Sequence, residues 1–162
     1  MNINKSIDSN YRYKFSKPII RLIGKGGNSN TIIDNLDIIV KQLNVPNTIL
    51  IKSISLDLNV SCNLDKLTIN GHHKEEVIIN SIYKYIFSIL ICNKCGIPEN
   101  YPELESKNIY LNCSACGNKC IYNTKNKYEI KLENFISKYL EKNEWTKNND
   151  VINNDIFKDD FN

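Results

Sequence analysis

The chain has 162 residues, a net charge of +3 at pH 7 and a hydrophobic fraction of 41%. That fraction is enough to build a buried core, which excludes a chain that is disordered throughout. The sequence has no run of about 18 apolar residues and no charged-then-apolar start, which excludes a transmembrane helix and a secretory signal. We therefore expect a cytoplasmic protein with no membrane association.

Charge is unevenly distributed along the chain. Residues 1–27 carry a net charge of +5, whereas residues 143–162 carry −3. Lysine supplies 19 of the 21 basic residues, and the two arginines are Arg12 and Arg21. The basic start indicates an acidic partner such as nucleic acid or phosphate, and a solvated flexible tail is the alternative.

The N-terminal part of the chain combines an irregular segment with two short apolar runs. Residues 1–17 have no apolar periodicity and precede Pro18, which predicts a mobile arm. "IIRLI" at 19–23 predicts a strand, "GKGGNSN" a glycine-rich turn, and "TII" at 31–33 a second strand.

Two helices are predicted next. Asp34 can cap a helix over "NLDIIVKQLN", which has helical apolar spacing and is followed by Pro46. "TILIKSISLDLN" at 48–59 fits both a helical face and the alternation of a strand, and a helix is favoured.

The middle of the chain predicts a hairpin and the longest helix. "VSCNLDKLTINGHH" indicates a short hairpin that ends in the Asn70–Gly71 turn. Residues 74–90 have one wide apolar stripe, the strongest helical pattern in the chain. "YEIKLENFISKYLEKN" at 128–143 predicts a further amphipathic helix. Its expected inner face is Ile130, Phe135, Ile136 and Leu140.

Four of the six cysteines follow the pattern C-x2-C-x17-C-x2-C: Cys92, Cys95, Cys113 and Cys116. This spacing is typical of a tetrahedral four-thiolate zinc site, and the glycine after each pair relieves a tight turn. Disulfides or free core thiols are the alternatives, and a cytoplasmic setting argues against the first. Four thiolates leave no open coordination position, so we expect one structural Zn²⁺.

These segments together predict an α+β fold, with a small α/β body and a C-terminal zinc ribbon. The expected organisation is a flexible basic arm at 1–17, the body at 18–91, the ribbon at 92–123, a helix at 124–143 and a disordered acidic tail at 144–162.

Other candidate motifs do not indicate an active site. "GKGGNSNT" fails the phosphate-loop pattern because Lys25 is followed by Gly26. His72 and His73 have no ligand partner at a recognisable spacing, and Cys62 and Cys120 are interpreted as ordinary thiols. We expect no enzymatic activity of the chain's own.

Several segments of the chain carry a family resemblance. They are "YRYK" in the basic arm, the "GKG" turn, "TII" with "NL" and "LNVP" around the first helix, "TINGHH" before the long helix, and the four-cysteine pattern. In this combination they resemble the N-terminal domain of eukaryotic translation initiation factor five, over residues 2–142. The beta subunit of initiation factor two has a similar body and cysteine spacing, whereas the arm is typical of factor five.

The resemblance implies a GTPase-activating role in translation initiation. The implied partners are initiation factor two, with GTP on its gamma subunit, the small ribosomal subunit and initiator tRNA. Arg12 is implied to be an arginine finger supplied in trans to that GTP, with Lys52 in support. Contacts to partners or nucleic acid are expected from Tyr11, Tyr13, Lys14, Lys17 and Lys25.

Two alternatives to this function remain open. One is a binding component like the beta subunit of initiation factor two, and the other is an RNA-binding zinc-ribbon protein. Beta subunits carry lysine blocks or an anchoring helix upstream, which this arm does not have. We expect a monomer in the cytoplasm, or in the host cytoplasm if the gene is viral.

Overall fold

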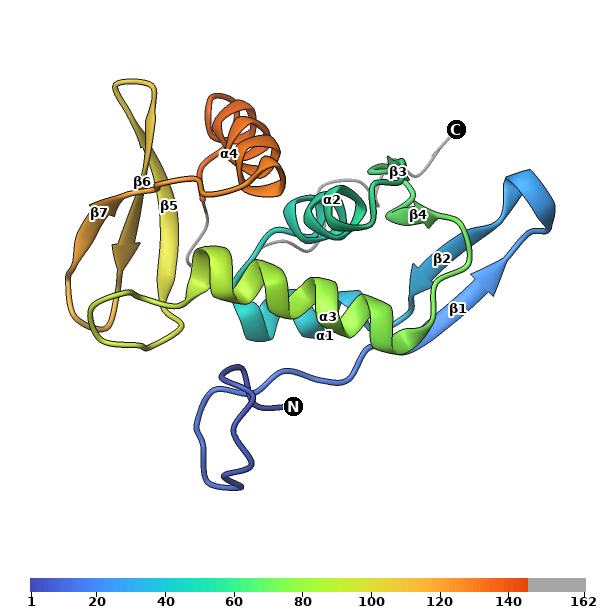
Figure 1. Cartoon of the computed structure of the whole chain (residues 1–162), viewed down its shortest axis with the longest axis horizontal. Coiled ribbons are helices and arrows are strands. Elements are labelled where there is room, and N and C mark those ends of the chain that lie inside the picture. The colour runs from blue at the N-terminus through green and yellow to red at the C-terminus, as the bar shows by residue number, and fades with distance from the viewer. Residues whose placement is uncertain (146–162) are drawn as a thin grey trace, which may run out of the picture.

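The computed structural model describes residues 1–145 and has an α+β architecture, as predicted. Two antiparallel sheets lie at opposite ends of a layer of helices (Figure 1). In chain order, the elements are β1 (Ile20–Ile23), β2 (Asn30–Ile33), α1 (Leu36–Leu43), α2 (Asn47–Leu58), β3 (Cys62–Asn63), β4 (Thr68–Asn70), α3 (Glu75–Tyr85), β5 (Asn100–Glu105), β6 (Asn108–Cys113), β7 (Lys119–Ile121) and α4 (Lys127–Leu140).

The first sheet has the strand order β1-β2-β4-β3, and the hairpin of β1 and β2 projects from the body (Figure 1). A 3₁₀ turn at Gly26–Asn28 joins the two strands, in the glycine-rich segment that predicts a turn. The second hairpin, β3 and β4, is also present. Its connection lies at 64–67, however, and the Asn70–Gly71 pair instead ends β4 and leads to α3.

Asp34 does not cap α1, so this prediction is wrong. Asn35 occupies the N-cap position, and its side chain accepts from the Ile19 amide and donates to the Lys17 carbonyl, at 2.8 Å each. Asp34 instead pairs with Arg21 of the facing strand, with 2.8 Å between Nη2 and Oδ1. The cross-strand partner outcompetes the capping position because the carboxylate gains a charge-assisted hydrogen bond there.

The ambiguous segment at 48–59 is helical up to Leu58, the last residue of α2, which confirms the helix. This helix packs against α1, α3, α4 and β4, and it is covered on several faces. A helix buried on several faces shows no clear polar side, which explains why its sequence resembles both patterns. The residues buried completely are Ile49, Leu50, Ile51, Ser53 and Ile54.

The longest predicted helix is also confirmed, with a change of geometry at its end. α3 continues as a π-helical turn at Ile86–Leu90 and reaches the cysteine segment directly. A three-stranded sheet, in the order β5-β6-β7, then forms the ribbon.

The inner face of α4 differs partly from the prediction. Tyr128, Leu132 and Ile136, spaced four residues apart, are buried against the core, whereas Ile130 is 48% exposed. Phe135 and Leu140 pack against the core at its edge. The prediction for Ile130 is therefore wrong, because the four-residue spacing turns it toward solvent.

Apart from its first two residues, the acidic tail predicted at 144–162 lies outside the described residues. Across residues 1–145, none of the helices has the length and apolar character needed to cross a bilayer.

The N-terminal segment is not the free arm that the sequence predicts. Residues 1–15 form a closed loop, in which the Ile3 amide donates to the Tyr13 carbonyl at 3.0 Å and the Phe15 amide to the Met1 carbonyl at 2.9 Å. Ile3 and Phe15 are buried, with 2% and 1% of their surfaces exposed. The burial of these two side chains holds both ends of the loop on the body.

Candidate metal centre and arginine loop

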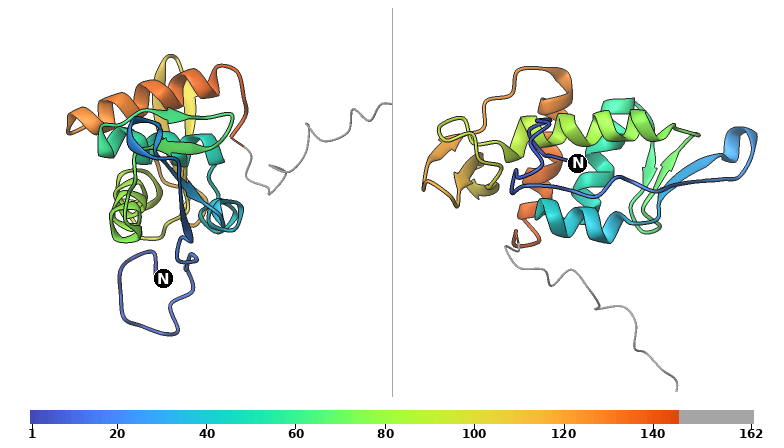
Figure 2. Two further views of the ribbon diagram at one scale, coloured as in Figure 1. Left: turned by 90° about the vertical axis from the view of Figure 1, so that its right-hand side faces the viewer. Right: turned by 90° about the horizontal axis from the view of Figure 1, so that it is seen from below.

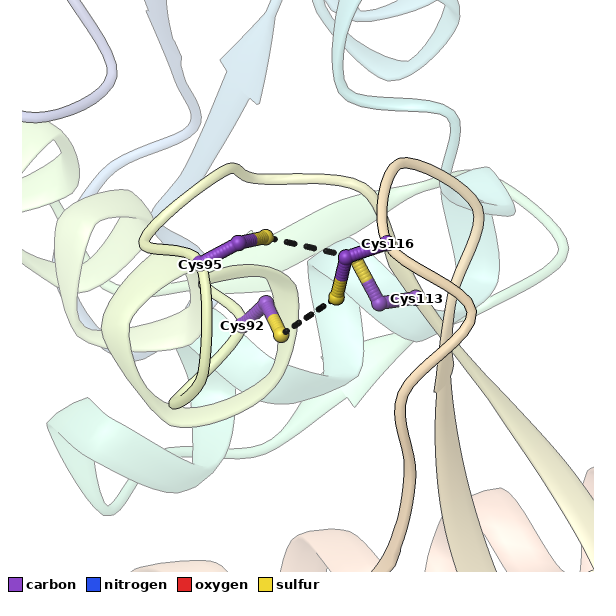
Figure 3. Close-up of side chains that lie close together, drawn as sticks. All are labelled: Cys92, Cys95, Cys113 and Cys116. Atoms are coloured by element: carbon purple, nitrogen blue, oxygen red, sulfur yellow. Dashed lines mark hydrogen bonds between the residues drawn. The ribbon is translucent and has the colours of Figure 1, made fainter.

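Four cysteine side chains meet at the end of the ribbon (Figure 3). Cys92 and Cys95 precede β5, Cys113 ends β6, and Cys116 follows it. The Sγ atoms of Cys92 and Cys116 lie 3.8 Å apart, those of Cys95 and Cys113 lie 3.7 Å apart, and all four lie within 4.8 Å of one another.

These distances fit a single tetrahedral metal site. Zinc–sulfur bonds of about 2.3 Å place the sulfurs of a regular tetrahedron about 3.8 Å apart. A disulfide would need a sulfur–sulfur distance of about 2.05 Å, and all four thiols are free. The cluster is therefore compatible with one zinc ion held by four ligands.

The glycine after each cysteine pair has the conformation that the knuckle turn requires. Gly96 has a φ of 71° and Gly117 a φ of 67°, a region that side-chain-bearing residues rarely adopt. Their amides donate to the carbonyls of Cys92 and Cys113, at 2.9 Å each. The sequence-based explanation of these two glycines is confirmed.

Hydrogen bonding and burial shift the pKa values of two clustered thiols, Cys92 and Cys113, in opposite directions. At Cys92, burial favours the thiol, but amide donors from Cys95 and Lys94 outweigh it and lower the pKa to about 7. Burial raises the pKa of the Cys113 thiol to about 12. A metal ion that binds all four as thiolates must displace protons, above all at Cys113.

Neither remaining cysteine belongs to the cluster, and the two histidines are bonded locally. Cys62 lies on β3, and Cys120 lies on β7 opposite Leu111. The His72 Nε2 atom lies 3.1 Å from the carbonyl oxygen of Ile23, and that of His73 lies 2.8 Å from the carbonyl oxygen of Asn70. These contacts give both imidazoles a structural role at the edge of the first sheet.

The two arginines have different surroundings. Arg21 is bound to Asp34 through Nε at 2.9 Å and Nη2 at 2.8 Å. Arg12 is exposed on the N-terminal loop, and its guanidinium carbon lies 5.7 Å from the centroid of the Tyr13 ring. No carboxylate within residues 1–145 forms an ion pair with Arg12. Arg21 is thus paired within the protein, whereas Arg12 has no carboxylate partner among residues 1–145.

The tyrosines beside Arg12 connect the loop to the ribbon. The rings of Tyr11 and Tyr13 are 5.9 Å apart, tilted by 58°. The Tyr13 hydroxyl donates to a Glu99 carboxylate oxygen at 2.5 Å, which raises the pKa of that tyrosine. Sequence reasoning missed Glu99 because 86 residues separate it from Tyr13 and no motif links them.

The lysines predicted to contact a partner do not form one cluster. Lys14 donates to the Ser9 carbonyl at 2.6 Å, and Lys17 pairs with Glu75 at 2.7 Å. Lys25 is exposed next to the 3₁₀ turn at the tip of the projecting hairpin. Lys14 and Lys17 are thus already engaged on the molecule's own surface.

Arg12 and Lys52 are not brought together. Lys52 is partly buried on α2, and its Nζ atom lies 5.7 Å from the centroid of the Phe135 ring of α4. The N-terminal loop and α4 lie on opposite sides of the helix layer (Figure 2). If both side chains act on one partner, they must contact separate surfaces of that partner.

Comparison with known proteins gives a consistent set of relatives. A sequence profile for the domain found in initiation factors 2B and 5 matches residues 3–119, which include Arg12 and the four clustered cysteines. Eukaryotic translation initiation factor 5 of Caenorhabditis elegans is 30% identical over 148 residues, which cover 88% of this chain and 32% of that protein.

Relatives from other organisms have the same coverage pattern. The factor of the same name from Mus musculus is 29% identical over 134 residues, with 78% of this chain and 31% of the relative covered. That from Dictyostelium discoideum is 29% identical over 120 residues, with 72% and 30% covered. The chain spans about a third of the length of these relatives.

Proposed function

Because the chain belongs to the family of the domain found in initiation factors 2B and 5, we propose that it is a translation initiation factor of the factor-5 type. In this role it regulates the hydrolysis of GTP bound to the gamma subunit of initiation factor two. The chain supplies a side chain to the active site of that GTPase and has no substrate of its own. It acts in the cytoplasm, on the small ribosomal subunit that carries initiator tRNA.

The observation that carries the proposal is the contrast between the two arginines. Arg12 is exposed without an ion pair within residues 1–145, whereas Arg21 is held by Asp34. GTP hydrolysis concentrates negative charge on the phosphoryl oxygens, and a guanidinium supplied by another protein stabilises that charge. A planar, permanently protonated fork suits this task better than an ammonium group does.

We propose that one Zn²⁺ supports the ribbon. The four clustered cysteines, Cys92, Cys95, Cys113 and Cys116, would all bind it as thiolates and leave no position for water or substrate. When bound, the ion would link the two knuckles through its four sulfur ligands and so stabilise the small sheet. The metal is thus assigned a structural role.

GTP hydrolysis in reconstituted initiation complexes tests the proposed function. Arg12→Ala should slow the step by about 10³-fold or more, as removal of an arginine finger does in other systems. Arg12→Lys should also fail, because the ammonium cannot bond two oxygens in one plane. The matched control is Arg21→Lys, which keeps the charge beside Asp34 and should retain wild-type rates. Equal rates for Arg12→Ala and wild type would overturn the assignment.

A binding component like the beta subunit of initiation factor two is the second candidate, because the matched domain is not confined to factor 5. A component of that kind would bind the gamma subunit stably and would need no arginine. Stable binding to initiation factor two, with hydrolysis unchanged in Arg12→Ala, would favour this alternative.

A further inference from the structure

The loop that carries Arg12 is joined to the ribbon that carries the four cysteines. The link is the hydrogen bond from the Tyr13 hydroxyl to the Glu99 carboxylate, 2.5 Å long. We propose that Glu99 and Tyr13 are positioning residues that fix the direction of Arg12, so that the metal-binding ribbon serves as the support of the arginine. This inference rests on the proposed function.

Glu99 is itself held by the two knuckles of the ribbon. Its backbone carbonyl accepts from the Ser114 amide at 3.0 Å, and Ser114 follows the cluster residue Cys113. On the other side, the Cys92 amide donates to the carbonyl of Ile97 at 3.0 Å, two residues before Glu99. The position of the Glu99 carboxylate therefore depends on the arrangement of the cysteine cluster.

Tyr13 transmits this position to its neighbour in the chain. Its carbonyl accepts the hydrogen bond from Ile3 that closes the loop, and its ring lies against the guanidinium of Arg12. The Tyr11 ring lies beside the Tyr13 ring, with centroids 5.9 Å apart. A shift of the Tyr13 ring would therefore change the direction in which the Arg12 side chain leaves the loop.

The Tyr13 ring is half-buried, and it packs against the core at the edge of a cleft. A cleft of about 240 Å³ separates the loop from the body here, lined by Ile3, Tyr13, Leu43, Pro98 and Glu99 among others. A half-buried ring has fewer packing contacts than an enclosed one, so packing restrains its direction only in part. The directional, charge-assisted hydrogen bond to Glu99 adds a second restraint.

Trypsin cleavage after Arg12, followed by mass spectrometry on the zinc-loaded full chain, measures release of the loop. Glu99→Ala should raise the rate of cleavage at this bond about tenfold, the effect expected for losing one charged hydrogen bond. Glu99→Gln keeps an acceptor oxygen and should restore most of the protection. Glu103→Ala is the matched control, because Glu103 lies on β5 of the same ribbon and contacts Asn112 and Lys119. A wild-type rate for Glu99→Ala would overturn the proposal.

Zinc removal tests whether the ribbon is the support. Chelation should raise cleavage after Arg12 in the wild type, and it should add little in Glu99→Ala, where the link is already lost. Cleavage after Lys131 of α4 serves as the internal reference for general unfolding. An equal increase after Arg12 in both proteins, relative to Lys131, would overturn the coupling.

The hydrolysis assay separates the positioning role from the proposed function. Tyr13→Phe keeps the ring but removes the hydroxyl, and it should lower the rate at saturating factor while the half-saturating concentration stays unchanged. If Arg12→Ala abolishes hydrolysis while Tyr13→Phe and Glu99→Ala keep the wild-type rate, the positioning role is refuted and the proposed function stands. Unchanged hydrolysis in Arg12→Ala would refute the proposed function, even if Glu99→Ala releases the loop.

Discussion

The rings of Phe15 and Tyr83 meet edge to face, with centroids 5.4 Å apart and an angle of 77° between their planes. Phe15 closes the N-terminal loop, and the Tyr83 hydroxyl on α3 donates to the Asn2 carbonyl at 2.9 Å. One side chain of α3 therefore contacts both ends of the loop. The attachment of the loop is part of the hydrophobic core.

Phe15→Ala should lower the free energy of unfolding by about 3 kcal/mol, because it leaves a cavity where a fully buried ring was. Phe15→Leu, which fills more of that space, should cost less. Urea unfolding of the full chain measures both. The control is Ile7→Ala, since the Ile7 side chain is fully exposed and its loss should change stability by less than about 0.5 kcal/mol. A loss of similar size for Ile7 and Phe15 would contradict the anchored loop.

Zinc affinity should rise with pH. The metal binds thiolates, and burial raises the pKa of Cys113 to about 12, so binding at neutral pH must release at least that proton. Each proton released makes the affinity about tenfold higher per pH unit. Competition titrations with a chelator at pH 6.5, 7.5 and 8.5 would measure this slope. An affinity that does not depend on pH would contradict four-thiolate binding.

Removal of single cysteines should separate the cluster from the other thiols. Cys113→Ser should lose the zinc ion, because oxygen replaces a buried thiolate ligand. Cys120→Ser, on the adjacent strand β7, should retain one zinc per chain. Elemental analysis of the purified proteins provides the measurement, and zinc loss in Cys120→Ser would show that the ligand set is wrong.

Gly24→Ala should disrupt the projecting hairpin. Gly24 has a φ of 74°, and a Cβ atom there would lie 2.1 Å from the carbonyl oxygen of Asn28. The strain should cost roughly 1–3 kcal/mol, and it should speed amide exchange in β1 and β2. Gly27→Ala is the matched control, because the same hairpin has open space at that position. Equal exchange rates in Gly24→Ala and Gly27→Ala would refute the clash.

Alkaline pH should destabilise the chain through its buried tyrosines. Burial raises the pKa of Tyr128 above the ordinary 10.0, as it does for Tyr122 and Tyr85. Below about pH 10 both the folded and unfolded chains keep these protons, so the stabilisation is complete. Above pH 10 the unfolded tyrosines ionise first, and stability falls by up to about 1.4 kcal/mol per pH unit for each.

Urea unfolding of the zinc-loaded chain at pH 8.5 and 10.5 tests this sign. Tyr128→Phe should lose the hydrogen bond to Ser53, 2.8 Å long, and become less stable at both pH values. Its further loss between the two values should nevertheless be smaller than that of the wild type. Tyr110→Phe, at a partly exposed position of β6, should follow the wild type. An equal loss in wild type and Tyr128→Phe would contradict the prediction.

The parts of the fold encoded by local spacing could be predicted from the sequence. The four cysteines and the glycines after them occupy fixed positions within two short knuckles, so their pattern alone indicates the cluster. α3 has one broad apolar stripe and is recognisable for the same reason. α2 is ambiguous because neighbours cover it on several faces, which removes the polar side that would reveal its period.

The attachment of the N-terminal loop could not be predicted in this way. Its anchors, Ile3 and Phe15, are single apolar residues that belong to no periodic run. Their burial depends on α3, whose Tyr83 lies far along the chain. The contact between Tyr13 and Glu99 is equally remote in sequence, so the direction of Arg12 is a property of the tertiary structure.

The π-helical turn at Ile86–Leu90, which continues α3, leaves only Ile91 before Cys92. The Ile91 amide still donates to the Ile86 carbonyl at 3.1 Å, so helical bonding extends to the residue before the first ligand. α3 runs from the first sheet to the ribbon (Figure 1). A displacement of the ribbon is therefore transmitted through the backbone of α3 to the first sheet, at the opposite end of the molecule.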